Sequence, residues 1–366
     1  MKIAILGDTH LGYSRFEDDS LKHAEKALLD ADQKADVIIH AGDLFDIKVP
    51  KLETINQALQ LFKKLKKPVI AIFGNHERRS KDMINPVQLL ANAGVLEYLH
   101  GTEKQIEMNG EKLQIFGMSS VPEELASTAI KTVMKNYSPK EDAFKILVIH
   151  QSIKELGSNS DNELSLEELE PLQFDLIING HIHKRESKLN GKFLIPGSTV
   201  LTQLKKDETE PKVYLLYDTK TRTFETIDFG SRKFFFEDLI FSGAGIQEVK
   251  SAVDQKIIEL KQANPDSIIK IKIKGTLKEG LDSKDISFPM RENVYIDNDF
   301  ESASIREKIE KIRSSRTENL SIKEFIMKQL AEKVNGKISI DSYLLFEKLL
   351  EGPDETIEWL KTHPLQ

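Results

Sequence analysis

The sequence predicts an α/β protein with mixed β-sheets, and three observations support this fold class. Short runs of β-branched and apolar residues recur between residues 2 and 183, and each is followed by a polar cluster. Segments with helical spacing lie between the early runs, which is typical of strand–helix alternation. Later segments place Asn-Gly pairs between apolar runs, and such pairs favour two-residue hairpins between antiparallel strands.

The expected strands are short and apolar throughout, as strands buried on both faces are. They lie in the segments 2–10, 36–46, 68–77, 145–151 and 175–183. Hairpins are expected at Asn109-Gly110 and Asn190-Gly191, and residues 212–229 form a third candidate pair. Because the early strands alternate with helices and the later ones form hairpins, we expect mixed sheets.

Two helices are expected between the early strands. The first covers 52–67 and stops at Pro68, with an apolar stripe at Leu52, Ile55, Leu59 and Phe62. The second begins at Pro86 and breaks at Gly94.

The pattern changes near residue 231. A helix with Ile246, Val249, Val253, Ile257 and Leu260 in register precedes the strictly alternating strand 267–277. From residue 303 the pattern is helical, and Gly352-Pro353 separates two helices of a hairpin over 341–362. We therefore expect three parts, namely 1–231, a small α/β unit over 232–302, and a helical region over 303–366.

Composition narrows the class of protein. The 366 residues are 39% hydrophobic and 30% charged, as in an ordinary soluble protein. Cysteine is absent, so disulfides and Cys-ligated metals are excluded, and a reducing, cytoplasmic location is expected. No apolar run reaches the length of a membrane span. The net charge of -7 gives no global positive field, so any DNA binding depends on local basic patches, metals or a partner.

Polar side chains suited to metal binding stand at the strand ends, where sites of α/β sheets form. They are Asp8, His10, Asp43, Asn75, His150, His181 and His183. Singly, the Asp and Asn residues also suit turns, and the histidines also suit a core. Together, carboxylate, amide and imidazole ligands suit Mn²⁺, Fe²⁺ or Zn²⁺ rather than Ca²⁺. Seven groups exceed the ligand set of one catalytic metal, so they indicate two metals bridged by a carboxylate, which is phosphoester hydrolysis chemistry.

His76 is interpreted differently from its neighbours. Asn75 supplies a neutral oxygen ligand, so the adjacent imidazole is free to protonate a leaving oxygen as a general acid. We therefore expect His76 to be catalytic rather than metal-binding.

In order, Asp-x-His, Gly-Asp, Gly-Asn-His-Glu, a lone His after a strand, and Gly-His-x-His resemble the calcineurin-like metallophosphoesterase signature over residues 8–183. The resemblance implies a sandwich of two mixed β-sheets flanked by helices. It also implies that Asp43 bridges two metals: one is held with Asp8, His10 and His183, and the other with Asn75, His150 and His181. The expected cofactor is two Mn²⁺ per subunit, with Mg²⁺, Fe²⁺ or Zn²⁺ as substitutes.

The motifs DTHLGY (8–13), GDLFD (42–46), GNHE (74–77) and GHIHK (180–184) resemble, more narrowly, DNA double-strand-break repair nucleases of the meiotic recombination eleven family. That likeness implies 3′-to-5′ exonuclease and endonuclease activity on DNA ends. It implies a nuclease domain over 1–231, a DNA-capping domain over 232–302, and a helical hairpin that binds a coiled-coil ABC-type ATPase. It also implies a homodimer.

Two residues depart from the family pattern. Asp46 stands where many members carry a second catalytic histidine, and Glu77 stands where aspartate is commoner. We expect both to lie behind the ligands, with Glu77 orienting an imidazole. Basic and polar residues that flank the motifs are candidate DNA phosphate contacts, with solvated surface charge as the alternative: Tyr13, Arg15, Arg78, Arg79, Lys184 and Arg185.

Apolar side chains of the C-terminal hairpin are more than two helices can bury. They suit a docking surface for the ATPase, or packing on the chain's own helices: Leu344, Leu345, Leu349, Ile357, Trp359 and Leu360. Leu59, Phe62, Leu89 and Leu90 suit a dimer interface or the core. Two rival functions remain open, namely a metallophosphoesterase acting on small phosphodiesters or nucleotides, and a non-catalytic scaffold on the same fold.

Overall fold

The computed structural model describes residues 1–80, 82–135, 137–157, 163–300 and 359. The chain divides into two compact units. Unit 1 comprises Met1–Glu237, Ile257–Lys270 and Glu292–Tyr295, and unit 2 comprises Asp238–Lys256, Ile271–Arg291 and Ile296–Gln366. The expected division at residues 231 and 302 stays a prediction, and the expected helical region lies outside the described residues, apart from Trp359.

Unit 1 contains two six-stranded mixed sheets. The first has the order β12-β11-β1-β2-β3-β4 and consists of β1 (Lys2–Leu6), β2 (Val37–His40), β3 (Val69–Ala71), β4 (Glu97–Tyr98), β11 (Val213–Asp218) and β12 (Thr223–Asp228). The strands β1, β2, β3 and β4 are parallel, whereas β11 pairs antiparallel with both β1 and β12.

The second sheet has the order β5-β6-β7-β8-β10-β9. It consists of β5 (Thr102–Met108), β6 (Glu111–Met118), β7 (Phe144–Ile149), β8 (Leu176–Asn179), β9 (Glu186–Lys188) and β10 (Phe193–Ile195). The strands β6, β7, β8 and β10 run parallel, while β5 and β9 are antiparallel edges.

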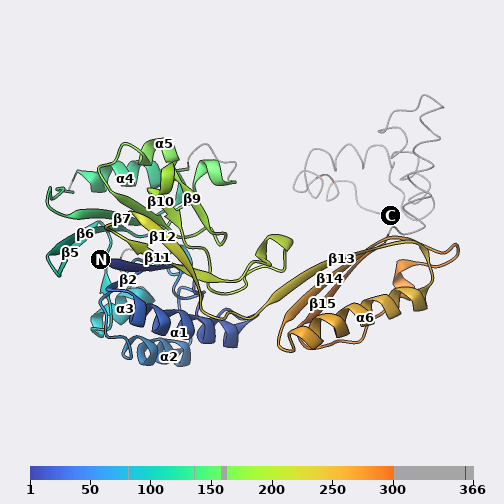
Figure 1. Cartoon of the computed structure of the whole chain (residues 1–366). Coiled ribbons are helices and arrows are strands. Elements are labelled where there is room, and N and C mark those ends of the chain that lie inside the picture. The colour runs from blue at the N-terminus through green and yellow to red at the C-terminus, as the bar shows by residue number, and fades with distance from the viewer. Residues whose placement is uncertain (81, 136, 158–162, 301–358, 360–366) are drawn as a thin grey trace. The chain divides into compact units, whose positions relative to one another are not determined.

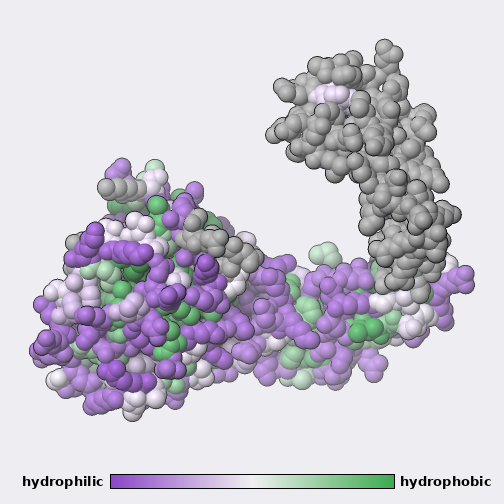
Figure 2. Space-filling model, turned by 90° about the horizontal axis from the view of Figure 1, so that it is seen from above, coloured by the Kyte–Doolittle hydropathy of each residue, from purple (hydrophilic) through white to green (hydrophobic). Residues whose placement is uncertain are grey.

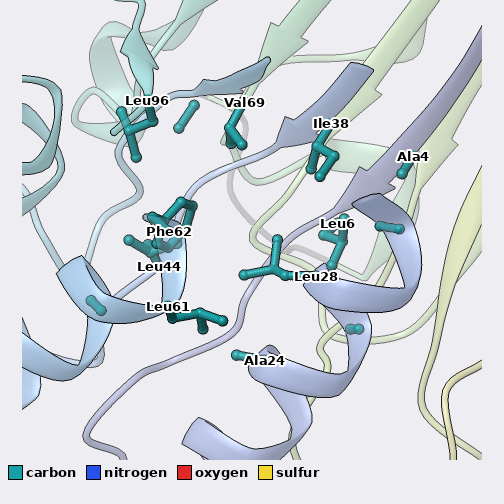
Figure 3. Close-up of a cluster of buried hydrophobic side chains, with 14 of the residues drawn as sticks. Ala4, Leu6, Ala24, Leu28, Ile38, Leu44, Leu61, Phe62, Val69 and Leu96 are labelled. Carbon is teal, nitrogen blue, oxygen red and sulfur yellow. The ribbon is translucent and has the colours of Figure 1, made fainter. Parts of the chain in front are cut away.

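Alternate residues of each strand point to opposite sides, so each sheet has an inner and an outer face, and the two inner faces pack against each other. Ile3 and Ile5 of the first sheet share one buried cluster with Ile146 and Val148 of the second. On the outer face of the first sheet lie α1 (Glu17–Lys34), α2 (Leu52–Phe62) and α3 (Pro86–Asn92). Figure 3 shows side chains of α1 and α2 packed against those of β1, β2 and β3.

The outer face of the second sheet is covered by α4 (Ala126–Met134) and α5 (Leu166–Leu169) (Figure 1). Unit 1 therefore has four layers, which confirms the predicted sandwich of two mixed sheets flanked by helices.

Several element limits differ from the predictions. The helix expected over 52–67 ends at Phe62, and Leu52, expected in its apolar stripe, has 79% of its surface exposed. The buried face of α2 consists of Thr54, Ala58, Leu61 and Phe62, so Leu52 lies off the face that packs on the core. The predicted hairpin at Asn109-Gly110 is confirmed, with both residues at positive φ, and β9 and β10 pair across Asn190-Gly191 through a short 3₁₀ turn.

The rest of the described chain forms a three-stranded sheet of order β13-β14-β15 and one helix. Its elements are β13 (Phe234–Ala244), α6 (Ile246–Ala263), β14 (Ile268–Leu277) and β15 (Val294–Phe300). The predicted alternation is confirmed in β14, where Ile269, Ile271 and Ile273 are buried. Hydrophilic residues predominate over the described part of the face shown in Figure 2. Among the described residues, no helix is long and apolar enough to cross a membrane.

Candidate metal centre

The polar clusters follow parallel strands of both sheets. Asp8, Asp43 and Asn75 come after β1, β2 and β3 of the first sheet, and His150 and His181 come after β7 and β8 of the second. Since the sheets pack face to face, their carboxyl ends meet, and the structure brings all seven predicted ligands together.

The backbone turns sharply at the ligands. Asp8, His10, Asp43 and His181 have φ values of 52°, 45°, 50° and 75°. Residues other than glycine rarely adopt this left-handed backbone conformation. Where they do, the surrounding structure stabilises it, often at a functional site. Each turn lets the chain leave a buried strand and aim a polar side chain at the centre.

Two glycines allow the ligand loops to approach one another. A Cβ atom on Gly74 would lie 2.0 Å from Asp43 Oδ1, and a Cβ atom on Gly180 would lie 2.1 Å from the Ala41 carbonyl oxygen. Both distances are far below contact range, so only glycine fits immediately before Asn75 and before His181.

The first ligand group contains Asp8, His10 and His183. The His10 Nε2 and His183 Nε2 atoms lie 3.1 Å apart, and His183 Nε2 lies 3.7 Å from Asp8 Oδ1. Asp8 is completely buried, and its Oδ2 atom has no hydrogen-bond partner in the structure. A buried, unpartnered carboxylate oxygen is costly, and a cation between these three side chains would satisfy it.

The second ligand group surrounds Asn75 Oδ1. This oxygen lies 3.0 Å from His150 Nε2 and 2.8 Å from His181 Nδ1, and His150 Nε2 is 3.3 Å from Asp43 Oδ2. His150 Nδ1 lies 2.8 Å from the Ala41 carbonyl, which only accepts, so this nitrogen carries a proton and donates it. In neutral His150 the Nε2 lone pair therefore points at two oxygens that also carry lone pairs, an arrangement that fits a metal cation.

Asp43 lies between the two groups. Its Oδ1 atom accepts a hydrogen bond from the His76 amide at 3.0 Å, while Oδ2 lies 4.0 Å from His10 Nε2 as well as close to His150. Ligand atoms of Asp8, Asp43 and His150 all lie within 4.8 Å of one another, as do those of Asp8, His10 and His183. The residues present thus fit the pair of divalent cations that the donor set implies.

The electrostatics of the centre reflect its buried ionisable groups. Burial raises the pKa of Asp8 to about 7. Burial alone would lower the pKa of His150, but the Asp43 and Asp8 carboxylates outweigh it and raise the pKa to about 9. A proton therefore occupies the space between His150 and Asp43 near pH 7, and a metal would have to displace it. Burial lowers the pKa of His181 to about 4 and that of His183 to about 3, so both imidazoles are neutral at that pH.

His76 lies at the open side of the centre. Its Nδ1 atom donates to the Asp46 carbonyl oxygen at 2.6 Å, and its Nε2 atom lies 4.0 Å from Asp43 Oδ2. The side chain is 37% exposed, whereas that of His10 is 2% exposed. His76 Nε2 also falls within 4.8 Å of ligand atoms of His10 and Asp43, so geometry alone permits it a ligand role as well.

Of the two family departures, Asp46 lies behind a ligand as expected, whereas Glu77 acts differently from what we expected. Glu77, expected to orient an imidazole, is fully buried and accepts hydrogen bonds from the backbone amides of Phe45 and Gly74, each at 2.8 Å. It ties two ligand loops together, and burial raises its pKa to about 8. The carboxylate beside an imidazole belongs instead to Asp46, whose Oδ1 lies 3.3 Å from His10 Nδ1.

The candidate DNA contacts flank the ligand motifs in the sequence, and several already have partners. Tyr13 donates to the Thr202 carbonyl at 2.7 Å, and Arg15 lies over the Tyr295 ring. Three others pair as follows: Arg79 with the Ile84 carbonyl, Lys184 with Glu186, and Arg185 with Glu210. Arg78 is half-buried beside a cavity of ≈ 490 Å³.

The candidate partner-binding residues are mostly outside the described part of the chain. Leu344, Leu345, Leu349, Ile357 and Leu360 lie there, whereas Trp359 is described and half-buried. Of the candidate dimer residues, Phe62 and Leu90 belong to the core, and Leu89 remains 40% exposed.

Sequence reasoning missed the hydroxyl residues that contact the ligands. Ser152 Oγ lies 2.9 Å from His181 Nε2, and Thr202 Oγ1 lies 2.8 Å from His183 Nδ1. Ser152 stands two residues after His150, but Thr202 follows no strand-end motif, so no pattern indicated it.

Comparison with known proteins agrees with this geometry. The calcineurin-like phosphoesterase family profile matches residues 1–185, just over half of the 366 residues. The DNA double-strand break repair protein Mre11 of Methanosarcina acetivorans is 26% identical over 97% of this chain and 58% of its own length. Mre11 of Methanocaldococcus jannaschii is 28% identical over 82% of this chain and 84% of its own, and Mre11 of Methanopyrus kandleri is 27% identical over 52% and 47%.

The chain thus spans between about half and most of the length of these relatives. The matched range 1–185 contains all seven predicted ligands and His76. The chain therefore belongs to the calcineurin-like phosphoesterase family.

Proposed function

We propose that this chain is a two-metal DNA nuclease that processes DNA double-strand breaks. One observation carries the proposal: carboxylate, amide and imidazole lone pairs from both sheets converge around Asp43. The relatives named above are DNA double-strand break repair proteins, which supports DNA as the substrate. Mn²⁺ is the proposed metal, since imidazole and carboxylate oxygen together suit it.

The proposed ligand sets share Asp43. Asp8, His10 and His183 would hold one cation with it, and Asn75, His150 and His181 would hold the other. Bound divalent cations supply Lewis-acid chemistry, neutralising a phosphodiester and lowering the pKa of water. The chain's own groups orient that site: Glu77 fixes the loops that carry Asp43 and Asn75 through two backbone amides.

His76 is the proposed general acid. Its Nδ1–H stays engaged with the Asp46 carbonyl, so the proton that moves is the one on Nε2, which faces the centre. The imidazolium gives this proton to the leaving 3′-oxygen and returns to the neutral ring with Nδ1–H retained. The exposed position of His76 allows a polymeric phosphodiester to reach it.

A nuclease assay tests the proposal. Purified chain with Mn²⁺ should degrade blunt-ended and hairpin DNA from 3′ ends, and His76→Ser should lower kcat by about 10²–10⁴-fold, the usual contribution of a general acid. Mn²⁺ binding, followed by electron paramagnetic resonance, should persist in this variant. Asn75→Ala should reduce both binding and cleavage.

The outcomes separate the rivals. Hydrolysis of bis(p-nitrophenyl) phosphate without DNA cleavage would indicate an enzyme of small phosphodiesters. Neither Mn²⁺ binding nor hydrolysis would indicate a non-catalytic scaffold. Cleavage that survives Asn75→Ala would rule out the two-metal ligand set.

We also propose the assembly that the resemblance implies. In it, 1–231 is the nuclease domain, 232–302 caps DNA, the chain forms a homodimer, and residues 341–362 bind a coiled-coil ABC-type ATPase. Exposed apolar side chains of unit 1, including Leu52, Met83 and Ile84, support a protein contact on this unit. Light scattering checks the dimer mass, and a binding assay with the chain shortened after residue 340 checks ATPase docking.

A further inference from the structure

The two histidines of Gly-His-Ile-His present different nitrogens to the metal centre. His183 directs Nε2 toward Asp8 and His10, while its Nδ1 faces Thr202 Oγ1 at 2.8 Å. His181 is reversed, with Nδ1 toward Asn75 Oδ1 and Nε2 toward Ser152 Oγ at 2.9 Å. Each outward nitrogen therefore meets a hydroxyl group.

The hydroxyl that contacts His183 belongs to Thr202, and it already donates its only proton to another group. Thr202 Oγ1 lies 3.0 Å from Glu208 Oε1, and a carboxylate only accepts hydrogen bonds. Thr202 therefore donates to Glu208, and its oxygen is left to accept. The contact with His183 then requires a proton on Nδ1, which leaves the Nε2 lone pair free to face the centre.

The hydroxyl behind His181 is arranged in the same way. Ser152 donates to Glu123 Oε1 at 2.8 Å, so Ser152 Oγ accepts from His181 Nε2. A proton on Nε2 leaves the Nδ1 lone pair of His181 facing Asn75 Oδ1 at 2.8 Å. This amide oxygen only accepts, so without a cation it competes with Ser152 for the single proton of the ring.

The two carboxylates are held differently. Glu208 pairs with Lys212, and both side chains are nearly buried, at 11% and 12% exposure. Lys212 also donates to Ser198 Oγ at 3.1 Å, which anchors the same loop. Glu123 is exposed, so competition from water weakens its hydrogen bond with Ser152. The constraint on His183 is therefore the stronger one.

We propose that Thr202–Glu208 and Ser152–Glu123 are two hydroxyl–carboxylate relays that favour opposite tautomers of His183 and His181. Each relay thereby points a bare nitrogen at its own metal position. The four residues are positioning residues, and they touch no reacting atom. The consequence for metal binding rests on the proposed function, whereas the tautomers do not.

Long-range ¹H–¹⁵N NMR of the metal-free full chain near pH 7 tests the tautomers. We expect His183 as the Nδ1–H form, and His181 as an equilibrium in which Ser152 stabilises the Nε2–H form against the pull of Asn75 Oδ1 on a proton at Nδ1. Thr202→Val, which keeps the shape but removes the hydroxyl, should change only His183. Ser152→Ala should change only His181, so each variant is the control for the other.

Two further variants distinguish loss of the hydroxyl contact from misfolding. Thr202→Ser restores the hydroxyl and should restore the His183 tautomer. In Glu208→Gln the amide donates as well as accepts, so Thr202 is no longer forced to donate, and the Nδ1–H population should fall. Tautomers that stay unchanged in all these variants would overturn the proposal.

Mn²⁺ binding gives the second readout. Thr202→Val should weaken binding of one Mn²⁺ by about 10–100-fold, as loss of a group that orients a ligand does, and Thr202→Ser should not. Thr209→Val is the matched control, since Thr209 is in the same loop but donates to the Lys206 carbonyl. If DNA is not cleaved but the tautomers respond as expected, the proposed substrate is wrong and the relays stand.

Discussion

Asp43 shows how one side chain organises two halves of a site. Its Oδ1 atom is anchored by the His76 amide, so the carboxylate cannot rotate freely, and Oδ2 is left toward His150 and His10. The φ of 50° at Asp43 aims the side chain away from β2. Position, not carboxylate chemistry alone, makes this residue the bridge in the proposed centre.

The glycine beside this carboxylate yields a prediction. Gly74→Ala places a Cβ atom 2.0 Å from Asp43 Oδ1, so the carboxylate must move. We expect Mn²⁺ affinity to fall by at least about tenfold and the free energy of unfolding to fall by about 1–3 kcal/mol, as in overpacked sites. Electron paramagnetic resonance and urea unfolding measure the two effects.

Gly7→Ala is the control, because its Cβ atom would meet Pro196 Cγ at 3.3 Å, a contact that a small shift relieves. Equal losses of Mn²⁺ affinity in the two variants would contradict the assignment to Asp43.

At the scale of elements, strands and their polar ends were predictable, and loops were not. Strands such as β2 and β8 are buried on both faces, so their sequences are continuous apolar runs that end where the ligands begin. The exposure of Leu52 depends on which face of α2 packs on the core, and the apolar spacing of the sequence did not identify that face. Thr202 contacts His183 only because of the tertiary fold of its loop, so no local sequence pattern predicts this contact.

The helix α3 gives the element-scale prediction. Asn85 precedes it, accepts from the Gln88 amide at 2.8 Å, and is followed by Pro86 at the first helical position. Asn85→Ala should lower the free energy of unfolding by about 1 kcal/mol, since an unpaired amide remains at the helix start. Thermal unfolding followed by circular dichroism measures this loss. Asn92→Ala, at the exposed last residue of α3, should leave stability unchanged, and equal losses would contradict a capping role.

At the scale of the whole molecule, the buried charges set a dependence of stability on pH. Asp8, Glu77 and His150 have pKa values raised to about 7, 8 and 9. Each group binds its proton more tightly in the folded state than in the unfolded state. The free energy of unfolding of metal-free protein should therefore fall as pH rises from 7 to 9. His181 and His183 are neutral in the folded state, and in the unfolded state they lose their remaining protons just above pH 7, so their opposing contribution is small and is confined to the lower end of the range.

Urea unfolding in the presence of a chelator checks this dependence. Added Mn²⁺ should raise stability most at the upper end of the range, because fewer protons then compete for the ligands. A free energy of unfolding that is constant or rises between pH 7 and 9 without metal would contradict the prediction.

The position of β1 in its sheet has a consequence for biosynthesis. Lys2 pairs with Asp218 of β11, and the hydroxyl of Thr219 bonds the Met1 carbonyl across 218 positions of sequence. At ordinary rates of translation, β11 is synthesised on the order of tens of seconds after β1. His183 likewise follows His10 by 173 positions. A nascent chain therefore cannot assemble the candidate metal centre until both sheets have emerged from the ribosome, so an unfinished chain lacks the complete centre.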